Sequence, residues 1–312
     1  MKKQTITSNM ILLLAAIIWG FAFVAQRVGA QHLGPFAFNG VRFALGCLSL
    51  IPLILIIDAK AGIRNILSEL RRTLPAGVIC GLVLFTAANL QQVGMPHTTA
   101  GKAAFITSLY IIIVPFLGIL LKHSIGLKTW VGAGFSLIGL YLLSVNEQFS
   151  IASWDILQLI GAFFWALHII VIGHFTRRLD GLKLSLIQIA TCSLLSLTVA
   201  IFFEGIPVIG LQQALVPLLY GGLASVGIAY TLQILGQKHA KESHAAIILS
   251  MENVFAALGG FLLLGENLGI RGSIGCFLMF TGLILSQLNW LKKKEPAPAP
   301  PPETEKSGTA SF

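Results

Sequence analysis

Long apolar stretches separated by short polar connections make up the chain from residue 10 to residue 290. A helix that crosses a bilayer needs about 20 predominantly apolar residues, and stretches of this length recur throughout. We expect ten membrane-spanning helices, at residues 10–28, 36–57, 74–95, 100–121, 127–145, 153–175, 182–204, 212–235, 243–264 and 268–290. The connections are too short to hold a soluble domain. The pattern therefore predicts an all-α, multi-pass integral membrane protein.

Composition supports this prediction and excludes a soluble domain. Hydrophobic residues make up 55% of the 312 residues and charged residues only 11%, whereas soluble domains carry roughly 25% charged residues. The first apolar run resembles a signal peptide, but it is too long for one, and we expect an uncleaved first span. Residues 291–312 are rich in proline, charge and small polar residues, and are predicted to form a disordered cytoplasmic tail.

The basic residues behind the net charge of +9 are distributed unevenly among the connections between the predicted spans. If the N-terminus is cytoplasmic, the cytoplasmic segments carry all of the 21 basic residues except Arg27, Arg42, Lys102 and Arg271. Such a bias matches the positive-inside rule. It predicts that both termini are cytoplasmic and that the charge serves membrane orientation, so no nucleic-acid partner is expected.

The two halves of the chain resemble each other. At an offset of 142 residues, positions 90–108 match positions 232–250 at eight places, among them Gln91 with Gln233 and Ser108 with Ser250. Trp19 and Trp165 also stand in similar surroundings, AAIIWGF and GAFFWAL. We therefore divide the chain into two five-helix repeats, at residues 9–145 and 153–290. Five is odd, so the second repeat enters the membrane inverted, an arrangement typical of secondary transporters with a central substrate site.

Several longer motifs add a resemblance to a known family: AAIIWGFAFVAQR, GVRFALG, QQVGMPHTTAGKAAFITSLYIIIVPFLGILL and ESHAAIILSMENVFAALGGFLLLGENL. With these, the chain resembles the drug/metabolite transporter superfamily, EamA type. The resemblance implies a ten-helix inverted-repeat fold that moves small metabolites, amino acids or drugs, often outward. It also implies a cavity lined by the first, third, fourth, sixth, eighth and ninth spans. One departure is that Glu252-Asn253 replaces the family's common Glu-Pro, so a helix break there cannot be assumed.

Glu252 is the first candidate for substrate binding or coupling. A charged side chain at the centre of a bilayer costs about 2.5–3.5 kcal/mol on insertion scales, and a glutamate can avoid part of this cost by binding a proton. Glu252 could thus couple transport to protons, pair with a cationic substrate, or form a fixed structural contact. If the ninth span is one continuous helix, Asn253 lies with Ser250 on a stripe of small residues, about 100° away from Glu252. Asn253 could then be a binding group or an interhelical hydrogen-bond donor.

Other polar and aromatic residues within the spans are further candidates. Trp19 and Trp165 lie in mid-span, where they could form a stacking wall or pack structurally. His168, one turn from Trp165, could titrate near neutral pH or be a hydrogen-bonded core residue. The pairs Asn89 with Gln92 and Tyr230 with Gln233 each share a helix face and could line the cavity or join helices. Arg42 and Lys102 lie near outer span ends, where they could form a gate or snorkel to the interface.

No motif points to a cofactor or to catalysis. The four cysteines lie inside predicted spans without metal-ligand spacing, and no phosphate-binding loop or metalloprotease motif occurs. We therefore expect a non-enzymatic secondary active transporter in the cytoplasmic (inner) membrane, exporting a small organic metabolite by alternating access, with protons as a candidate coupling ion. The alternatives are a passive facilitator of the same fold and, less in keeping with the scattered polar residues, a membrane-embedded lipid enzyme. Substrate and oligomeric state stay open.

Overall fold

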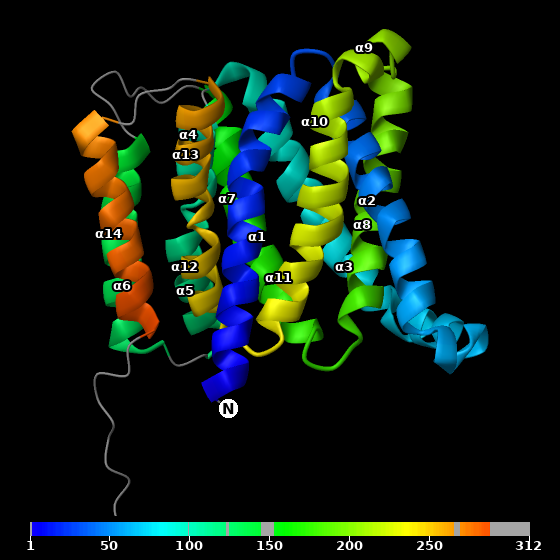
Figure 1. Cartoon of the computed structure of the whole chain (residues 1–312), viewed down its shortest axis with the longest axis horizontal. Coiled ribbons are helices and arrows are strands. Elements are labelled where there is room, and N and C mark those ends of the chain that lie inside the picture. Colours follow the sequence, from blue (N-terminus) through cyan, green and yellow to red (C-terminus); the bar gives the residue numbers. More distant parts are fainter. Residues whose placement is uncertain (1, 99, 123–124, 145–152, 265–268, 288–312) are drawn as a thin grey trace, which may run out of the picture.

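The computed structural model describes the whole chain except residues 1, 99, 123–124, 145–152, 265–268 and 288–312. The described part is a bundle of long helices (Figure 1). Nine helices in it are long and apolar enough to cross a membrane, and a shorter apolar helix at Leu127–Leu143 is the tenth. The ten-span prediction is confirmed, while the predicted disordered tail at residues 291–312 lies outside the described residues.

The first half contains five spans, of which the fourth is divided. Its elements are α1 (Lys2–Gly29), α2 (Pro35–Ile57), η1 (Ala59–Ala61), α3 (Ile63–Gly94), η2 (Met95–His97), α4 (Ala100–Thr107), α5 (Tyr110–Leu120) and α6 (Leu127–Ser144). Helix α3 begins eleven residues earlier than hydropathy predicts. Its first turns carry the polar residues of the connection, so hydropathy marks only the apolar part of a longer helix.

The second half repeats this pattern, with its third and fourth spans divided. Its elements are α7 (Ser153–Phe175), α8 (Gly181–Phe203), α9 (Val208–Gln213), α10 (Leu215–Leu219), η3 (Tyr220–Ala229), α11 (Tyr230–Gln237), α12 (Glu242–Leu249), α13 (Glu252–Leu264) and α14 (Gly269–Gln287). The segment η3 is a π-helix of ten residues. Such widened turns are rare and occur often at functional sites.

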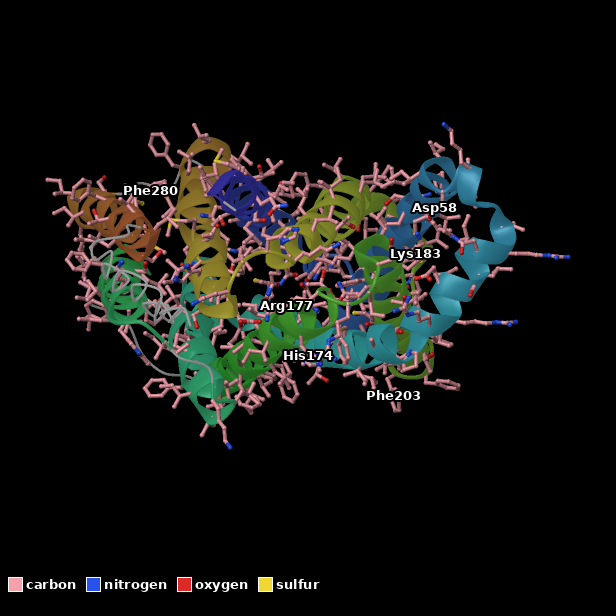
Figure 2. All side chains as sticks on the ribbon, turned by 90° about the horizontal axis from the view of Figure 1, so that it is seen from below. Asp58, His174, Arg177, Lys183, Phe203 and Phe280 are labelled. Carbon is pink, nitrogen blue, oxygen red and sulfur yellow. The ribbon has the colours of Figure 1, made fainter. Side chains whose placement is uncertain are left out.

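The divided spans of the two halves, α4–α5 and α12–α13, run in opposite directions. In Figure 1 the chain descends from α4 to α5 and ascends from α12 to α13. Most of the packing is between the halves: α2 lies against α8, α6 against α14, α3 against α7 and α8, and α1 against α11 and α13. The centre of the bundle is therefore formed by both repeats together. Exposed apolar side chains such as Phe203 lie on the perimeter (Figure 2), as expected for a surface in contact with lipid.

A carboxylate from one repeat caps a helix of the other. Glu204, at the end of α8, accepts hydrogen bonds from the backbone N–H groups of Phe36 at 3.3 Å and Ala37 at 2.9 Å, in the first turn of α2. These N–H groups have no partner within their own helix. The negative charge also suits the positive end of the helix dipole. This contact joins α2 and α8 at the end of the bundle opposite the N-terminus.

Helices α6 and α14 approach each other through glycines. A Cβ atom placed on Gly139 would lie 2.5 Å from the carbonyl oxygen of Gly275, and one placed on Gly275 would lie 2.6 Å from that of Gly139. Small residues permit this close backbone contact, which favours helix association in a bilayer. The α6–α14 pair is therefore held by backbone packing.

We predict that Gly139→Ala separates α6 from α14 and lowers the free energy of unfolding by about 1–3 kcal/mol, as overpacking does. Gly134→Ala is the matched control on the same helix, because a Cβ there meets nothing within 4 Å. It should be neutral or stabilise by up to about 1 kcal/mol. Thermal unfolding in detergent measures both, and equal stability of the two variants would contradict the packing described here.

Candidate functional site

Two membrane-spanning helices are broken at corresponding positions of the repeats. Helix α4 ends at Thr107 and α5 begins at Tyr110, whereas α12 ends at Leu249 and α13 begins at Glu252. The offset of 142 residues relates Thr107 to Leu249 and Tyr110 to Glu252. The break in the ninth span therefore occurs without the proline that the family commonly has beside the glutamate.

Tight turns and polar side chains satisfy the backbone at these breaks. Leu109 N–H donates to the Ile106 carbonyl at 3.2 Å, and Met251 N–H donates to the Ile248 carbonyl at 3.1 Å, both one residue closer than in an α-helix. The Asn253 side-chain amide donates to the Ser250 carbonyl at 3.0 Å. Inside a bilayer there is no bulk water to replace such bonds, so broken helices depend on them.

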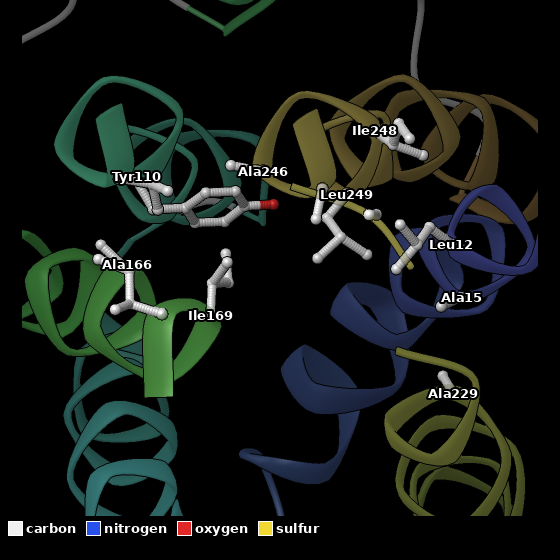
Figure 3. Close-up of a cluster of buried hydrophobic side chains, with 13 residues drawn as sticks. Leu12, Ala15, Tyr110, Ala166, Ile169, Ala229, Ala246, Ile248 and Leu249 are labelled. Atoms are coloured by element: carbon white, nitrogen blue, oxygen red, sulfur yellow. The ribbon is translucent and has the colours of Figure 1, made fainter. Parts of the chain in front are cut away.

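Tyr110 and Glu252, which correspond in the two repeats, meet each other. The Tyr110 hydroxyl donates to Glu252 Oε1 at 2.9 Å, and the Ser108 hydroxyl lies 3.4 Å from the same oxygen. Asn253 Nδ2 in turn donates to Ser108 Oγ. Figure 3 shows the Tyr110 ring reaching from α5 toward Leu249 of α12, with Ile169 beside it. The buried carboxylate is thus held by donors from the other repeat.

Glu252 and Tyr110 lie in the wall of a narrow cavity between the repeats. Its volume is about 40 Å³. The lining residues come from α1, α2, α3, α4, α5, α7, η3, α11, α12 and α13: Trp19, Phe23, Gln26, Arg42, Gln91, Thr107, Tyr110, Trp165, Ile169, Ser225, Tyr230, Gln233, Leu249 and Glu252. These are the spans that the family resemblance implies, with the second span in addition.

Aromatic rings form one part of the cavity wall. The Trp19 and Tyr230 rings meet edge to face with centroids 4.9 Å apart, and the Trp165 and Tyr230 rings are nearly parallel at 6.3 Å. Trp19 Nε1 donates to the Ser225 carbonyl at 3.1 Å, within the π-helical segment η3. The cavity therefore combines flat apolar walls with a few fixed polar groups, as small-molecule sites usually do.

Comparison with known proteins agrees with this architecture. The family model described as "EamA-like transporter family" matches residues 6–145 and 152–288. The chain belongs to the EamA-like transporter family. It is 32% identical over 278 residues to an "Uncharacterized transporter" of Archaeoglobus fulgidus, covering 89% of this chain and 84% of the relative. It is 23% identical over 289 residues to "Uncharacterized transporter YoaV" of Bacillus subtilis, covering 89% and 96%.

A solved structure supports the fold of this EamA-like transporter. A chain described as "Crystal structure of protein" superposes with a TM-score of 0.73 at 20% identity, covering 90% of this chain and 97% of the other. At this identity the likeness concerns the fold alone. Together with the family match, the ten spans make the chain a membrane transporter and not an enzyme.

Of the residues expected to bind or gate, six line the cavity of this EamA-like transporter: Glu252, Trp19, Trp165, Tyr230, Gln233 and Arg42. The other expected residues lie outside the lining and make contacts between helices. Asn89 bonds to Asn39 and Ser196, each at 2.9–3.0 Å. Gln92 donates to the Gln26 carbonyl at 3.2 Å, and His168 lies 2.9 Å from Gln188. The role of these residues in transport stays a prediction.

The two basic candidates are both buried or paired. Arg42 is only 2% exposed, so its side chain does not snorkel to the interface. Lys102 Nζ lies 2.6 Å from Asp155 Oδ2, which joins α4 of the first repeat to α7 of the second. Hydropathy cannot distinguish these arrangements from snorkelling, because each depends on a partner far along the chain.

The expectation for Asn253 requires a correction. We placed Asn253 on one stripe with Ser250 by assuming one continuous helix, but the helix is interrupted between Leu249 and Glu252, and Ser250 lies outside α13. Glu252 and Asn253, adjacent in α13, both contact Ser108, Glu252 as acceptor and Asn253 as donor. The break changes the angular position of the residues that follow it. A helical wheel that joins Ser250 to Asn253 across the break is therefore wrong.

Two glutamines that line the cavity, Gln26 and Gln91, were not predicted from the sequence as site residues. Gln91 Nε2 donates to Gln26 Oε1 at 3.0 Å, and Gln91 Oε1 accepts from Trp165 Nε1 at 2.9 Å. Gln91 thus fixes the orientation of Trp165 across the repeat boundary. Its identity with Gln233 in the repeat alignment was a signal that could have identified it.

We predict that Tyr110→Phe removes the hydrogen bond to Glu252 and lowers the free energy of unfolding by about 0.6–1.7 kcal/mol, from the average to the largest value found for such bonds in a membrane protein. Tyr141→Phe is the control, because Tyr141 is half-exposed and its hydroxyl makes no hydrogen bond within the described part of the chain. Thermal unfolding of both variants, repeated in a Glu252→Ala background, completes the double-mutant cycle. The same loss with and without Glu252 would exclude the contact as its cause.

Proposed function

We propose that this protein is a secondary active transporter that exports a small organic metabolite across the cytoplasmic (inner) membrane by alternating access. The main support is that broken helices from both repeats meet at one cavity, with the carboxylate of Glu252 at the meeting point. Discontinuous helices at the repeat interface are where secondary transporters bind substrate and coupling ions. The predicted cytoplasmic position of both termini and the two-repeat division are part of this proposal.

Glu252 is the proposed coupling group. The Tyr110 and Ser108 hydroxyls approach one of its oxygens, and no cation pairs with it in the described part of the chain. A carboxylate without a fixed counter-ion can exchange its charge for a proton or for a cationic group of the solute. Either exchange changes the cost of keeping it inside the bilayer. Substrate and proton can therefore act on the same group.

Ion pairs between the repeats close the two ends of the bundle. Lys102 with Asp155 joins α4 to α7 at the end opposite the N-terminus. Lys183 of α8 pairs with Asp58, beside η1, at the N-terminal end, where Figure 2 shows both residues. Alternating access requires that one end opens while the other stays closed. Each pair is thus proposed as a contact that opens in one half of the cycle.

We expect Glu252→Gln to abolish the response of transport to a pH gradient, because glutamine cannot bind and release the coupling proton. The measurement is uptake and counterflow in proteoliposomes, using the amino acid or related metabolite that most stabilises the purified protein in a thermal-shift screen. Glu69→Gln is the control, since Glu69 lies on the surface, paired with Arg72. Proton dependence equal to that of the unmodified protein would exclude coupling by Glu252, and transport without counterflow would indicate a pore.

For the ion pairs, we expect Asp155→Asn to favour opening at the end opposite the N-terminus. A cysteine at position 26, in a variant lacking the four native cysteines, reports this through its reaction with a membrane-impermeant thiol reagent. The rate of this reaction should rise about tenfold if the substitution destabilises the closed state by about 1.4 kcal/mol. Asp58→Asn should slow the same reaction or leave it unchanged. A rise in both variants would indicate general loosening in place of gating.

A further inference from the structure

The guanidinium of Arg42 is a buried cation without a counter-ion. Its side chain is 2% exposed and lies in the cavity wall. Its Nε donates to Asn39 Oδ1 at 2.8 Å. In the part of the chain that the structure describes, no carboxylate lies within ion-pair distance of it. Burying an unpaired charge is costly, so the cavity keeps a cation that a partner from outside would stabilise.

The surroundings of Arg42 hold its position but do not neutralise it. Asn39 is itself fixed, because its Nδ2 donates to the Ala88 carbonyl and to Asn89 Oδ1, both at 3.0 Å. The guanidinium carbon lies 5.6 Å from the centre of the Phe38 ring and 5.1 Å from that of Phe43. These contacts involve Nε and the flat faces of the guanidinium. The two terminal nitrogens have no hydrogen-bond partner among the described residues.

Gln233 provides a second, independent sign of a missing ligand. It is 1% exposed, lies in the same cavity wall, and its Oε1 has no hydrogen-bond partner among the described residues. Its counterpart in the first repeat, Gln91, is fully engaged with Gln26 and Trp165. A buried amide oxygen without a partner costs about 1–3 kcal/mol. Two unsatisfied polar groups in one cavity indicate a site built for a polar solute.

We propose that Arg42 is the anion-binding group of the cavity, and that the transported solute carries a carboxylate on an apolar or aromatic body. A planar guanidinium binds a carboxylate through two parallel hydrogen bonds, and Arg42, whose terminal nitrogens have no partner among the described residues, lies in the cavity wall. The aromatic wall of Trp19, Trp165 and Tyr230 suits the body of the solute. Glu252 lies in the same wall with the opposite charge, so a solute with both an ammonium and a carboxylate group satisfies both. This inference rests on the proposed transport function.

Three matched probes test the anion subsite by binding alone. Phenylalanine carries both charges, 3-phenylpropionate only the carboxylate, and phenethylamine only the ammonium. Titration of the purified protein, followed by tryptophan fluorescence and thermal stabilisation, gives each Kd. We expect Arg42→Gln to raise the Kd of phenylalanine and of 3-phenylpropionate by about tenfold to a hundredfold. The Kd of phenethylamine should change by less than about twofold. Glu252→Gln should instead raise the Kd of phenylalanine and phenethylamine, which carry the ammonium group, and leave that of 3-phenylpropionate nearly unchanged.

Two further variants keep the test decisive. Arg42→Lys retains the charge but loses the planar pair of donors, so it should weaken the carboxylates by less than Arg42→Gln does. It also serves if Arg42→Gln fails to fold. Arg64→Gln is the control, because Arg64 is exposed outside the cavity. Carboxylate affinities unchanged in both Arg42 variants would overturn the proposal.

Other outcomes are equally informative. Failure of every carboxylate from acetate to 3-phenylpropionate to bind would overturn the proposal. Binding of chloride or inorganic phosphate in place of these carboxylates, with the same dependence on Arg42, would show a structural anion site and overturn it too. Because binding is measured without transport, Arg42-dependent binding by a protein that fails to transport would contradict the proposed function and not the subsite.

Discussion

The cross-repeat contact between Tyr110 and Glu252 is the interaction on which the centre of this transporter depends. Both spans are interrupted in mid-membrane, where unsatisfied backbone groups and a carboxylate would each cost free energy. The Tyr110 hydroxyl, 2.9 Å from Glu252 Oε1, links the two interruptions across the repeats. The residues that flank the interruptions, Thr107 and Tyr110 in one span and Leu249 and Glu252 in the other, line the cavity. A contact that stabilises the fold therefore also forms the site.

The interlocked repeats explain why one cavity serves both halves. Helices α2 and α8, and α6 and α14, pack as corresponding pairs, and α3 and α11 each lie against helices of the other repeat. Residues at the centre of the bundle consequently contact the equivalent residues of the other repeat, as Tyr110 contacts Glu252. Movement of one repeat against the other must change these contacts first. This is the physical link between the architecture and the alternating access that we propose.

Divergence between the repeats gives the cavity its chemical character. Gln91 is occupied in orienting Trp165, whereas the corresponding Gln233 has an unpartnered oxygen. Glu252 contributes a carboxylate where the first repeat has Tyr110. Arg42 contributes a cation that has no counterpart in the corresponding region of the cavity wall. Duplication supplies the frame, and these substitutions make one side of the cavity different from the other.

Hydropathy and the repeated motifs were enough to predict ten spans, because lipid contact imposes an apolar pattern on each spanning segment separately. They also identified Glu252, Tyr230, Gln233 and both tryptophans of the cavity wall. The break at Ser250–Met251 was not predictable from a helix wheel, and Arg42 gave no sign of its burial. Whether Asn89 joins helices or Gln91 lines the cavity depends on residues more than 60 positions away. Such choices are made by packing between repeats, which only the tertiary structure decides.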